Sequence, residues 1–131
     1  MCHVKTIMTP NPFSVGPETT IDEAISKMLE HRVSGLPVVD AAGQLLGVIS
    51  EIDIIDLVFD ADIDTSTVGD YMARDVATLS PEASLDDAAS KFSSLSVRRF
   101  PVLDDGRLVG ILSRRDLLRF IRDARKQAVA G

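Results

Sequence analysis

The sequence is poor in the residue types that build disulfides, zinc sites and aromatic stacking platforms. It has one cysteine, two histidines, one tyrosine and no tryptophan. Cys2 alone forms no disulfide within the chain, and it lacks partners at the spacing of zinc ligands. The scarcity of aromatic rings argues against a protein that binds nucleic acids by stacking on their bases. We therefore expect neither an internal disulfide nor a metal site.

Long apolar runs are also missing. No segment approaches the roughly 18 consecutive apolar residues of a membrane span, and no apolar signal segment follows the N-terminal residues. The chain has no Gly-x-x-x-x-Gly-Lys phosphate loop, and neither His3 nor His31 has a recognisable acid–base partner in the sequence. These absences predict a cytoplasmic protein that does not insert into membranes and is not an enzyme.

Acidic residues outnumber basic ones, but unevenly along the chain. The net charge is −6 at pH 7, which argues against a general affinity for nucleic acids. Residues 1–66 contain 3 Lys or Arg and 11 Asp or Glu, a net of −8, whereas residues 67–131 contain 11 and 9, a net of +2. This asymmetry indicates either a site for an anion in the second half or a drift of surface charge without function.

The chain does contain an internal sequence repeat. Residues 47–53 (GVISEID) recur as residues 110–116 (GILSRRD), and residues 36–40 (LPVVD) recur as residues 100–104 (FPVLD). The offset is 64 up to a glycine-containing turn that is one residue longer in the first copy, and 63 after it. The chain therefore consists of two copies of one small unit. We assign repeat 1 to residues 4–60, a linker to 61–67 and repeat 2 to 68–124.

Each copy predicts the order strand, helix, strand, strand, helix. Thr20 with Glu23, and Ser84 with Asp87, mark the starts of the two first helices. A helical period of about 3.6 places an apolar face on each of them. These faces consist of Ile21, Ala24, Ile25, Met28 and Leu29 in repeat 1 and of Leu85, Ala88, Ala89, Phe92 and Leu95 in repeat 2.

Hairpins and closing helices complete each copy. Strands at residues 37–39 and 45–49 flank one glycine-containing turn, and strands at residues 101–103 and 108–112 flank the other. Closing helices are expected over residues 51–59 and from residue 114 to about residue 126.

The predicted fold class is α+β, with two βαββα repeats packed as a pseudo-twofold sandwich. A unit of about 60 residues buries little surface, so each copy needs a partner for its apolar sheet face. The other copy is the nearest such partner. Ligands favour the clefts where such units meet.

The pattern resembles a tandem pair of CBS domains (cystathionine β-synthase-type domains, together a Bateman module). Each copy has a leading hydrophobic triplet, Ile7-Met8-Thr9 or Tyr71-Met72-Ala73, and a proline four residues before the first helix. A Leu-Pro-Val or Phe-Pro-Val strand and a Gly-h-h-Ser-x-x-Asp end, in which h is hydrophobic, complete the pattern.

The resemblance implies a non-catalytic regulatory module without a required cofactor. Members of the family bind adenosine compounds such as AMP, ADP or ATP, and in some cases S-adenosylmethionine or NAD. It further implies that two modules pair as a homodimer and that a stand-alone module regulates a separate partner protein.

The Ser-x-x-Asp ends admit two interpretations. Ser50 and Ser113 can cap the closing helices, with Asp53 and Asp116 at the positive helix end, and this requires no ligand. A carboxylate in the same place can also accept hydrogen bonds from the two hydroxyls of a ribose, which is the role that the resemblance implies for the matching aspartate. Both interpretations can hold together.

Arginines distinguish the second copy. Arg98-Arg99 replaces Ser34-Gly35, and the resemblance implies that basic residues at this point contact phosphate, for which the forked arginine side chain is suited. The alternative is that these arginines are solvated. We expect the stronger adenosine site in repeat 2, formed by Thr78, Arg98, Arg99, Phe100, Pro101, Ser113, Arg115 and Asp116. The weaker site in repeat 1 is expected at Ser14, Gly35, Leu36, Pro37, Ser50 and Asp53.

Several of these positions have structural alternatives. Gly47 and Gly110 admit the close approach of a ligand or backbone, or mark a bulge. Leu36 and Phe100 can form apolar walls for a base or belong to the core. Two other functions also remain open: a scaffold that dimerises without a ligand, and a nucleic-acid-binding protein that uses the basic last helix.

Overall fold

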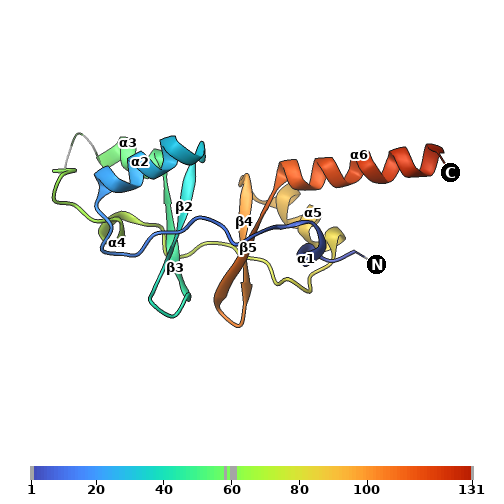
Figure 1. Ribbon diagram of the computed structural model, residues 1–131, viewed down its shortest axis with the longest axis horizontal. Helices are drawn as coiled ribbons and strands as arrows, with labels where there is room; N and C mark the ends of the chain where they lie inside the picture. The colour runs from blue at the N-terminus through green and yellow to red at the C-terminus, as the bar shows by residue number, and fades with distance from the viewer. Residues whose placement is uncertain (1, 58, 60–61, 131) are drawn as a thin grey trace. The chain divides into compact units, whose positions relative to one another are not determined.

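The computed structural model describes residues 2–57, 59 and 62–130, and it divides into two compact units (Figure 1). One unit joins Met1–Pro12 to Ala77–Gly131, and the other consists of Phe13–Val76. We call them the C-unit and the N-unit. Each unit therefore combines one repeat with the leading segment of the other repeat.

The C-unit contains a three-stranded antiparallel sheet of order β1-β5-β4. The hairpin of β4 and β5 is continuous with the longest helix, α6 (red in Figure 1). The elements are α1 (Val4–Ile7), β1 (Thr9–Pro10), α5 (Leu85–Ser94), β4 (Arg99–Asp104), β5 (Arg107–Ser113) and α6 (Arg114–Ala130).

The N-unit has the same plan with a two-stranded antiparallel sheet. Its elements are α2 (Ile21–His31), β2 (Gly35–Val39), β3 (Leu45–Ser50), α3 (Glu51–Leu57) and α4 (Val68–Tyr71). The predicted α+β class, both hairpins and the order helix, strand, strand, helix are confirmed.

The first helices begin where the capping residues predict. The Thr20 Oγ1 atom accepts a hydrogen bond from the Glu23 N–H at 3.1 Å, and the Ser84 Oγ atom accepts one from the Asp87 N–H at 3.1 Å. Each bond satisfies a backbone donor that has no partner within its helix. The acidic residues in both first turns favour the positive end of the helix dipole.

The leading segment of each repeat packs into the unit of the other repeat. Thr9 and Pro10 pair with Ile111 and Gly110 on β5, and Ala73 pairs with Val48 through two backbone hydrogen bonds of 2.9 Å. The predicted leading strand is thus a two-residue strand in repeat 1 and a single bridge in repeat 2. The pairing partner of such a segment lies far away in sequence, so local pattern does not reveal it.

Each leading segment also contributes to a core. Val4 is fully buried with Leu79, Phe100 and Leu112, and Val68 is fully buried with Ile21 and Ile49. Gly47 and Gly110 leave room for these segments: a Cβ atom on Gly47 would collide with the Ala73 carbonyl oxygen, and one on Gly110 with Met8 and Thr9. The register also shifts beside both glycines, as a bulge would require. The close approach at these glycines is therefore made by backbone.

Three residues assigned to the apolar helix faces are not buried. Leu29 is 74% exposed and Leu95 is 40% exposed, and Ala89 is also exposed. The buried stripe is thus narrower than the apolar face that the spacing predicts: Ile21, Ala24 and Met28 fill it on α2, but only Ala88 is buried on α5.

The closing helices differ in length. α3 ends at Leu57, so the prediction of helix up to Phe59 is wrong at Phe59, which lies in a turn, while Val58 is outside the described residues. α6 continues to Ala130, four residues past the expected end. Asp60, at the end of repeat 1, and Ala61, at the start of the predicted linker, lie outside the described residues. Within the linker, the Asp62 carbonyl accepts hydrogen bonds from the Ser66 N–H and hydroxyl.

Candidate functional site

Ser113 and Asp116 form a closed pair of hydrogen bonds where β5 becomes α6. The Ser113 N–H donates to Asp116 Oδ2 at 2.9 Å, and the Asp116 N–H donates to Ser113 Oγ at 3.1 Å. The side chain of Asp116 is only 10% exposed, and its other oxygen, Oδ1, lies 3.5 Å from Nη1 of Arg119. The capping role is confirmed, and it leaves Oδ1 as the carboxylate oxygen that a hydroxyl could share.

Repeat 1 has the same arrangement. The Ser50 N–H donates to Asp53 Oδ2 at 3.0 Å, and the Asp53 N–H donates to Ser50 Oγ at 3.2 Å. Three residues beyond the aspartate, however, Asp56 occupies the position that Arg119 holds in repeat 2. The two carboxylates therefore have the same backbone setting and opposite neighbouring charges.

Backbone pairing brings most of the predicted stronger site to one end of the C-unit sheet. Arg99 pairs with Ser113 across β4 and β5, and the Arg114 N–H donates to the Arg98 carbonyl at 3.0 Å. On the other side of β4, the Leu79 N–H donates to the Pro101 carbonyl at 3.0 Å, which places the preceding Thr78 beside this strand. Arg98 is exposed and Arg99 is half-buried.

The weaker site is assembled in the same way in the N-unit. Gly35 pairs with Ser50, and the Glu51 N–H donates to the Ser34 carbonyl at 2.9 Å. The Val15 N–H donates to the Pro37 carbonyl at 3.0 Å, so the preceding Ser14 lies beside β2. No arginine stands on these strand ends, and Glu51 adds a negative charge.

The proposed apolar walls are interior side chains. Leu36 is 1% exposed and Phe100 is 0% exposed, and both prolines that follow them are buried. The ring of Phe100 lies 4.7 Å from that of Phe92, centroid to centroid. The alternative of a core role is thus confirmed for the leucine and phenylalanine, and a part for these four residues in ligand binding stays a prediction.

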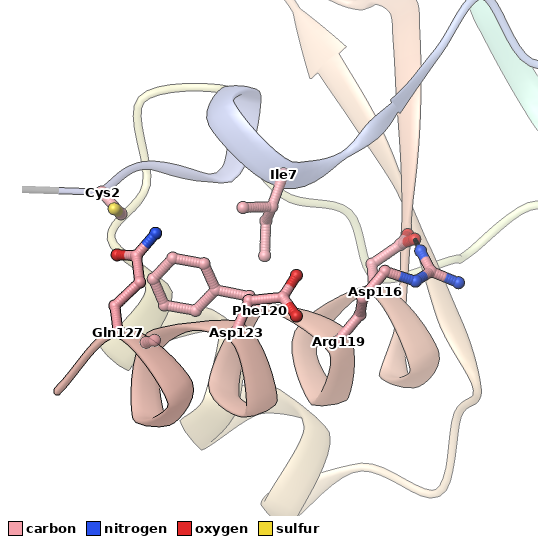
Figure 2. A pocket seen from close by; sticks show the side chains of 8 residues that line it. Cys2, Ile7, Asp116, Arg119, Phe120, Asp123 and Gln127 are labelled. Atoms are coloured by element: carbon pink, nitrogen blue, oxygen red, sulfur yellow. Dashed lines mark hydrogen bonds and ion pairs between the residues drawn. The ribbon is translucent and has the colours of Figure 1, made fainter. Parts of the chain in front are cut away.

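A cavity of about 470 Å³ opens beside Asp116, between the N-terminal segment and α6 (Figure 2). Its volume lies within the range of about 300–1,000 Å³ that is usual for ligand pockets. Asp116 is the one residue of the predicted set that lines it. The sequence motifs did not indicate the other seven lining residues, which are Cys2, Ile7, Arg119, Phe120, Asp123, Ala124 and Gln127.

Most of these missed residues could have been found from helical spacing. Arg119, Phe120, Asp123 and Gln127 follow Asp116 at intervals of three or four and so share one face of α6. Cys2 and Ile7 could not, because they stand at the start of the chain, before and within repeat 1, and reach this cavity through the exchange of leading segments.

Other kinds of site find no support in the described part of the chain. No group of three or more His, Cys, Asp or Glu residues there is placed to hold a metal ion. His31 stacks on the ring of Phe13, with centroids 3.5 Å apart. None of the described helices is both long enough and apolar enough to cross a bilayer.

Comparison with known proteins gives a consistent result. The model of the CBS domain matches residues 4–60 and again residues 68–123. The chain is 36% identical to the CBS domain-containing protein YhcV of Bacillus subtilis over 118 residues, covering 89% of this chain and 84% of that protein. It is 35% identical over 90% of its length to the uncharacterized protein MJ1225 of Methanocaldococcus jannaschii, of which it spans only 42%.

Solved structures share the fold along nearly the whole chain. CBSX2 of Arabidopsis thaliana, in a structure with AMP, has a TM-score of 0.87 and 33% identity, over 95% of this chain and 99% of that one. The CBS domain pair of protein MJ0100, in complex with 5-methylthioadenosine and S-adenosyl-L-methionine, has a TM-score of 0.81 and 30% identity, over 95% and 98% of the two chains. The resemblance inferred from the repeated motifs is confirmed.

Proposed function

The chain belongs to the CBS domain family, and we propose that it is a regulatory module that binds an adenosine nucleotide at Asp116. The observation that carries this proposal is the buried, hydrogen-bonded carboxylate of Asp116 at the strand-to-helix junction of repeat 2. The AMP found with CBSX2 supports the ligand class, because that chain shares this fold over 95% of the present one.

The ribose of the ligand would lie against Asp116. Oδ2 is held by the Ser113 N–H, which orients the carboxylate before any ligand arrives. Oδ1 can then accept a hydroxyl hydrogen bond, and such bonds to a charged acceptor are about twice as strong as neutral ones. The weak contact of Oδ1 with Arg119, at 3.5 Å, is exchanged at little cost.

The phosphate would be held by the arginines near the start of β4 and α6. Arg98 and Arg99 lie next to Ser113 through strand pairing. Arg115 stands in the first turn of α6, one turn before Arg119. Forked guanidinium groups match phosphate oxygens. This charge makes the repeat 2 site suited to AMP, ADP or ATP.

The repeat 1 site suits a ligand without phosphate. Asp53 has Asp56 and Glu51 near it in sequence, and Ser34 and Gly35 replace the arginines. An anion is repelled there, whereas an uncharged or cationic adenosine compound is not. The complex of MJ0100 with 5-methylthioadenosine and S-adenosyl-L-methionine is an example of such ligands on this fold.

The module has a binding role and no catalytic one. It would respond to the nucleotide by changing the surface that it presents to a separate partner protein. The bound ligand would contact the strand and helix ends that form the site and so stabilise the folded state. This added stability is the free energy available for regulation.

A thermal-shift series tests the nucleotide site. The wild-type protein is heated with AMP, ADP, ATP, S-adenosylmethionine and NAD in turn. A ligand at 100 times its Kd stabilises the folded state by about 2.7 kcal/mol. For a chain of this size, that raises the Tm by roughly several degrees. We expect at least one phosphorylated compound to do this.

Asp116→Asn and Asp53→Asn are the matched variants. Asparagine retains an oxygen that can accept the Ser113 N–H bond, so Asp116→Asn keeps the helix cap and loses the charge. The shift caused by the phosphorylated compound should largely disappear in Asp116→Asn and persist in Asp53→Asn, with both unliganded proteins still melting cooperatively. The absence of a shift with every compound in the wild type would overturn the proposal.

A further inference from the structure

Arg119 lies between the carboxylate of Asp116 and a second hollow on α6. Its Nη1 atom is 3.5 Å from Asp116 Oδ1, and Figure 2 shows its guanidinium beside that carboxylate, at the opposite end of the cavity from Gln127. The side chain of Arg119 is 59% exposed, whereas that of Asp116 is 10% exposed. A largely exposed cation therefore lies against a largely buried carboxylate.

The second hollow is lined mainly by arginines, and we call it the arginine hollow. It has a volume of about 410 Å³, and its lining residues are Arg115, Leu118, Arg119 and Arg122. This volume is within the range of about 300–1,000 Å³ that is usual for ligand pockets. Arg119 stands four residues after Arg115 and three before Arg122, so the three arginines share one side of α6.

Two carboxylates contact the three arginines of this hollow. Asp116 is the partner of Arg119, and Asp123 Oδ1 accepts a hydrogen bond from Arg122 Nε at 3.3 Å. Both of these arginine side chains are more than half exposed, so the two ion pairs can rearrange at little cost. A guanidinium group has five N–H donors, so one weak carboxylate contact leaves most of them available to an anion.

The orientation of a bound ribose decides which part of a ligand lies near Arg119. A ribose held by Asp116 has its 2′ and 3′ hydroxyls at the carboxylate, and its 5′ position on the other side of the sugar ring. Oδ2 accepts the Ser113 N–H at 2.9 Å, so Oδ1, beside Arg119, is the better acceptor for one hydroxyl. A substituent on the neighbouring hydroxyl would then project toward the arginine.

Charge gives the two ends of such a ligand separate partners. The arginines at the start of β4, Arg98 and Arg99, are those proposed above for the 5′ phosphate, whereas Arg119 and Arg122 stand further along α6. In dinucleotide-binding sites an acidic residue binds the ribose hydroxyl, and a nearby arginine accommodates a 2′-phosphate. Asp116 and Arg119 supply both groups. The charge of Arg119 would also offset the repulsion between Asp116 and a phosphate on the ribose.

We propose that the site at Asp116 recognises an adenosine nucleotide with two phosphates, one at the 5′ position and one on a ribose hydroxyl. The second phosphate lies in the arginine hollow against Arg119 and Arg122, and Asp116 holds the remaining hydroxyl. The proposal rests on the proposed function, since it requires a ribose at Asp116. It does not extend to repeat 1, where Asp56 stands at the position of Arg119 and would repel such a phosphate.

Isothermal titration calorimetry with four compounds tests where the second phosphate binds. AMP has one phosphate, and ADP has two at the 5′ end and so controls for ligand charge. Adenosine 2′,5′-bisphosphate and adenosine 3′,5′-bisphosphate distinguish the two ribose hydroxyls. At least one bisphosphate should bind the wild-type protein about tenfold more tightly than ADP, because its second phosphate gains hydrogen bonds from charged donors.

Arg119→Met and Arg125→Met are the matched variants. Both remove one positive charge from α6, but Arg125 is exposed and does not line the arginine hollow. The measured quantity is the Kd for ADP divided by the Kd for the favoured bisphosphate, so that a general loss of affinity cancels. This ratio should fall from about ten to about one in Arg119→Met and stay near ten in Arg125→Met. An equal fall in both variants would indicate a general effect of charge and overturn the proposal.

Phosphorus NMR of the bound bisphosphate locates each contact, because its two phosphates give separate signals. Arg119→Met should shift the signal of the phosphate on the ribose hydroxyl and leave the 5′ signal nearly in place. Arg98→Met should do the opposite, since Arg98 stands at the start of β4 beside Ser113. A shift of the 5′ signal alone in Arg119→Met would overturn the proposal.

The calorimetric outcomes also distinguish the second phosphate from the proposed function itself. If AMP binds and neither bisphosphate binds more tightly than ADP, the proposed function stands and no phosphate on the ribose is recognised. If ADP binds as tightly as the bisphosphates and loses this affinity in Arg119→Met, the arginine hollow holds a 5′ phosphate chain, and the proposal is wrong. Failure of all four compounds to bind overturns both.

Discussion

The two oxygens of Asp116 have different partners. Oδ2 accepts the Ser113 N–H and so stabilises the start of α6, while Oδ1 lies 3.5 Å from Nη1 of Arg119. The residue as a whole lines the cavity (Figure 2). The residue type and spacing that make a helix cap are the same as those that hold a ribose. For this reason the sequence motif alone left both interpretations open.

A surface ion pair links the two chain segments that form the C-unit. The Lys5 Nζ atom donates to Glu82 Oε1 at 2.9 Å and to Oε2 at 3.2 Å. The hydrogen bond and the charge of Lys5 lower the pKa of the exposed Glu82 carboxyl below its ordinary 4.5. The pair connects residues 77 positions apart, so it reports on the docking of the leading segment.

We predict that the Glu82 pair loses its effect in acid. The folded-state pKa of Glu82 lies below the unfolded one, so the contribution of the pair is complete above the unfolded value and disappears as the pH falls through the folded value. Because both side chains are exposed, the effect on stability is small. NMR titration should find a Glu82 pKa below 4.5 in the wild type and an ordinary one in Lys5→Ala. Equal values in both proteins would contradict the ion pair.

At the scale of elements, the glycines of β3 and β5 mark where another backbone segment lies. Gly47 faces the Ala73 carbonyl, which accepts the Val48 N–H at 2.9 Å, and Gly110 faces Met8 and Thr9. Met8 meets Gly110 with its flexible thioether, whereas Ala73 meets Gly47 with its backbone. The two positions therefore differ in how far their neighbours can yield.

We predict that Gly47→Ala is more destabilising than Gly110→Ala. The new methyl group of the first variant displaces a hydrogen-bonded backbone carbonyl and should lower the free energy of unfolding by about 1–3 kcal/mol. The thioether of Met8 can move aside, so the second variant should lose less. Urea denaturation followed by circular dichroism measures both. Equal and negligible losses would show that the backbones do not approach closely.

The two closing helices begin with the same capping motif but present different surfaces. α3 has 7 residues with acids on its flanks, and α6 has 17 with arginines on its flanks. Both begin with the same Ser-x-x-Asp cap. The cap therefore does not decide the surface that each helix presents, which is set by the residues at intervals of three and four along it.

At the scale of the whole molecule, the chain exchanges its leading segments. Val4 stands in repeat 1 by sequence and in the core of the C-unit by structure, while Val68 stands in repeat 2 and in the core of the N-unit. Val4 is anchored by its N–H, which donates to the Ala83 carbonyl at 2.9 Å. Neither unit is complete without a segment from the other half of the chain.

We predict that a small change in one repeat loosens the unit built around the other. Val4→Ala and Val68→Ala each replace a buried isopropyl group by a methyl group. Each should lower the free energy of unfolding by about 2 kcal/mol, including the cost of the cavity that remains. Hydrogen exchange followed by mass spectrometry should show faster exchange within residues 77–126 for Val4→Ala. For Val68→Ala, the faster exchange should fall within residues 13–57.

Each of these variants serves as the control for the other. If the units followed the sequence repeats, the two patterns of exchange would be reversed. Uniform acceleration along the whole chain would instead mean that the chain unfolds as one cooperative body, and would contradict independent docking of the leading segments.

The amino-acid sequence determined the doubled α+β plan, the Thr20, Ser84, Ser50 and Ser113 caps, and both hairpins. These depend on interactions within a few residues, and local spacing records such interactions. Tertiary structure alone decided that leading segments change units, that Leu36 and Phe100 lie inside the cores, and that Cys2 and Ile7 reach the cavity at Asp116. Those outcomes depend on which distant surface completes a sheet edge or fills a core, and no local pattern encodes that choice.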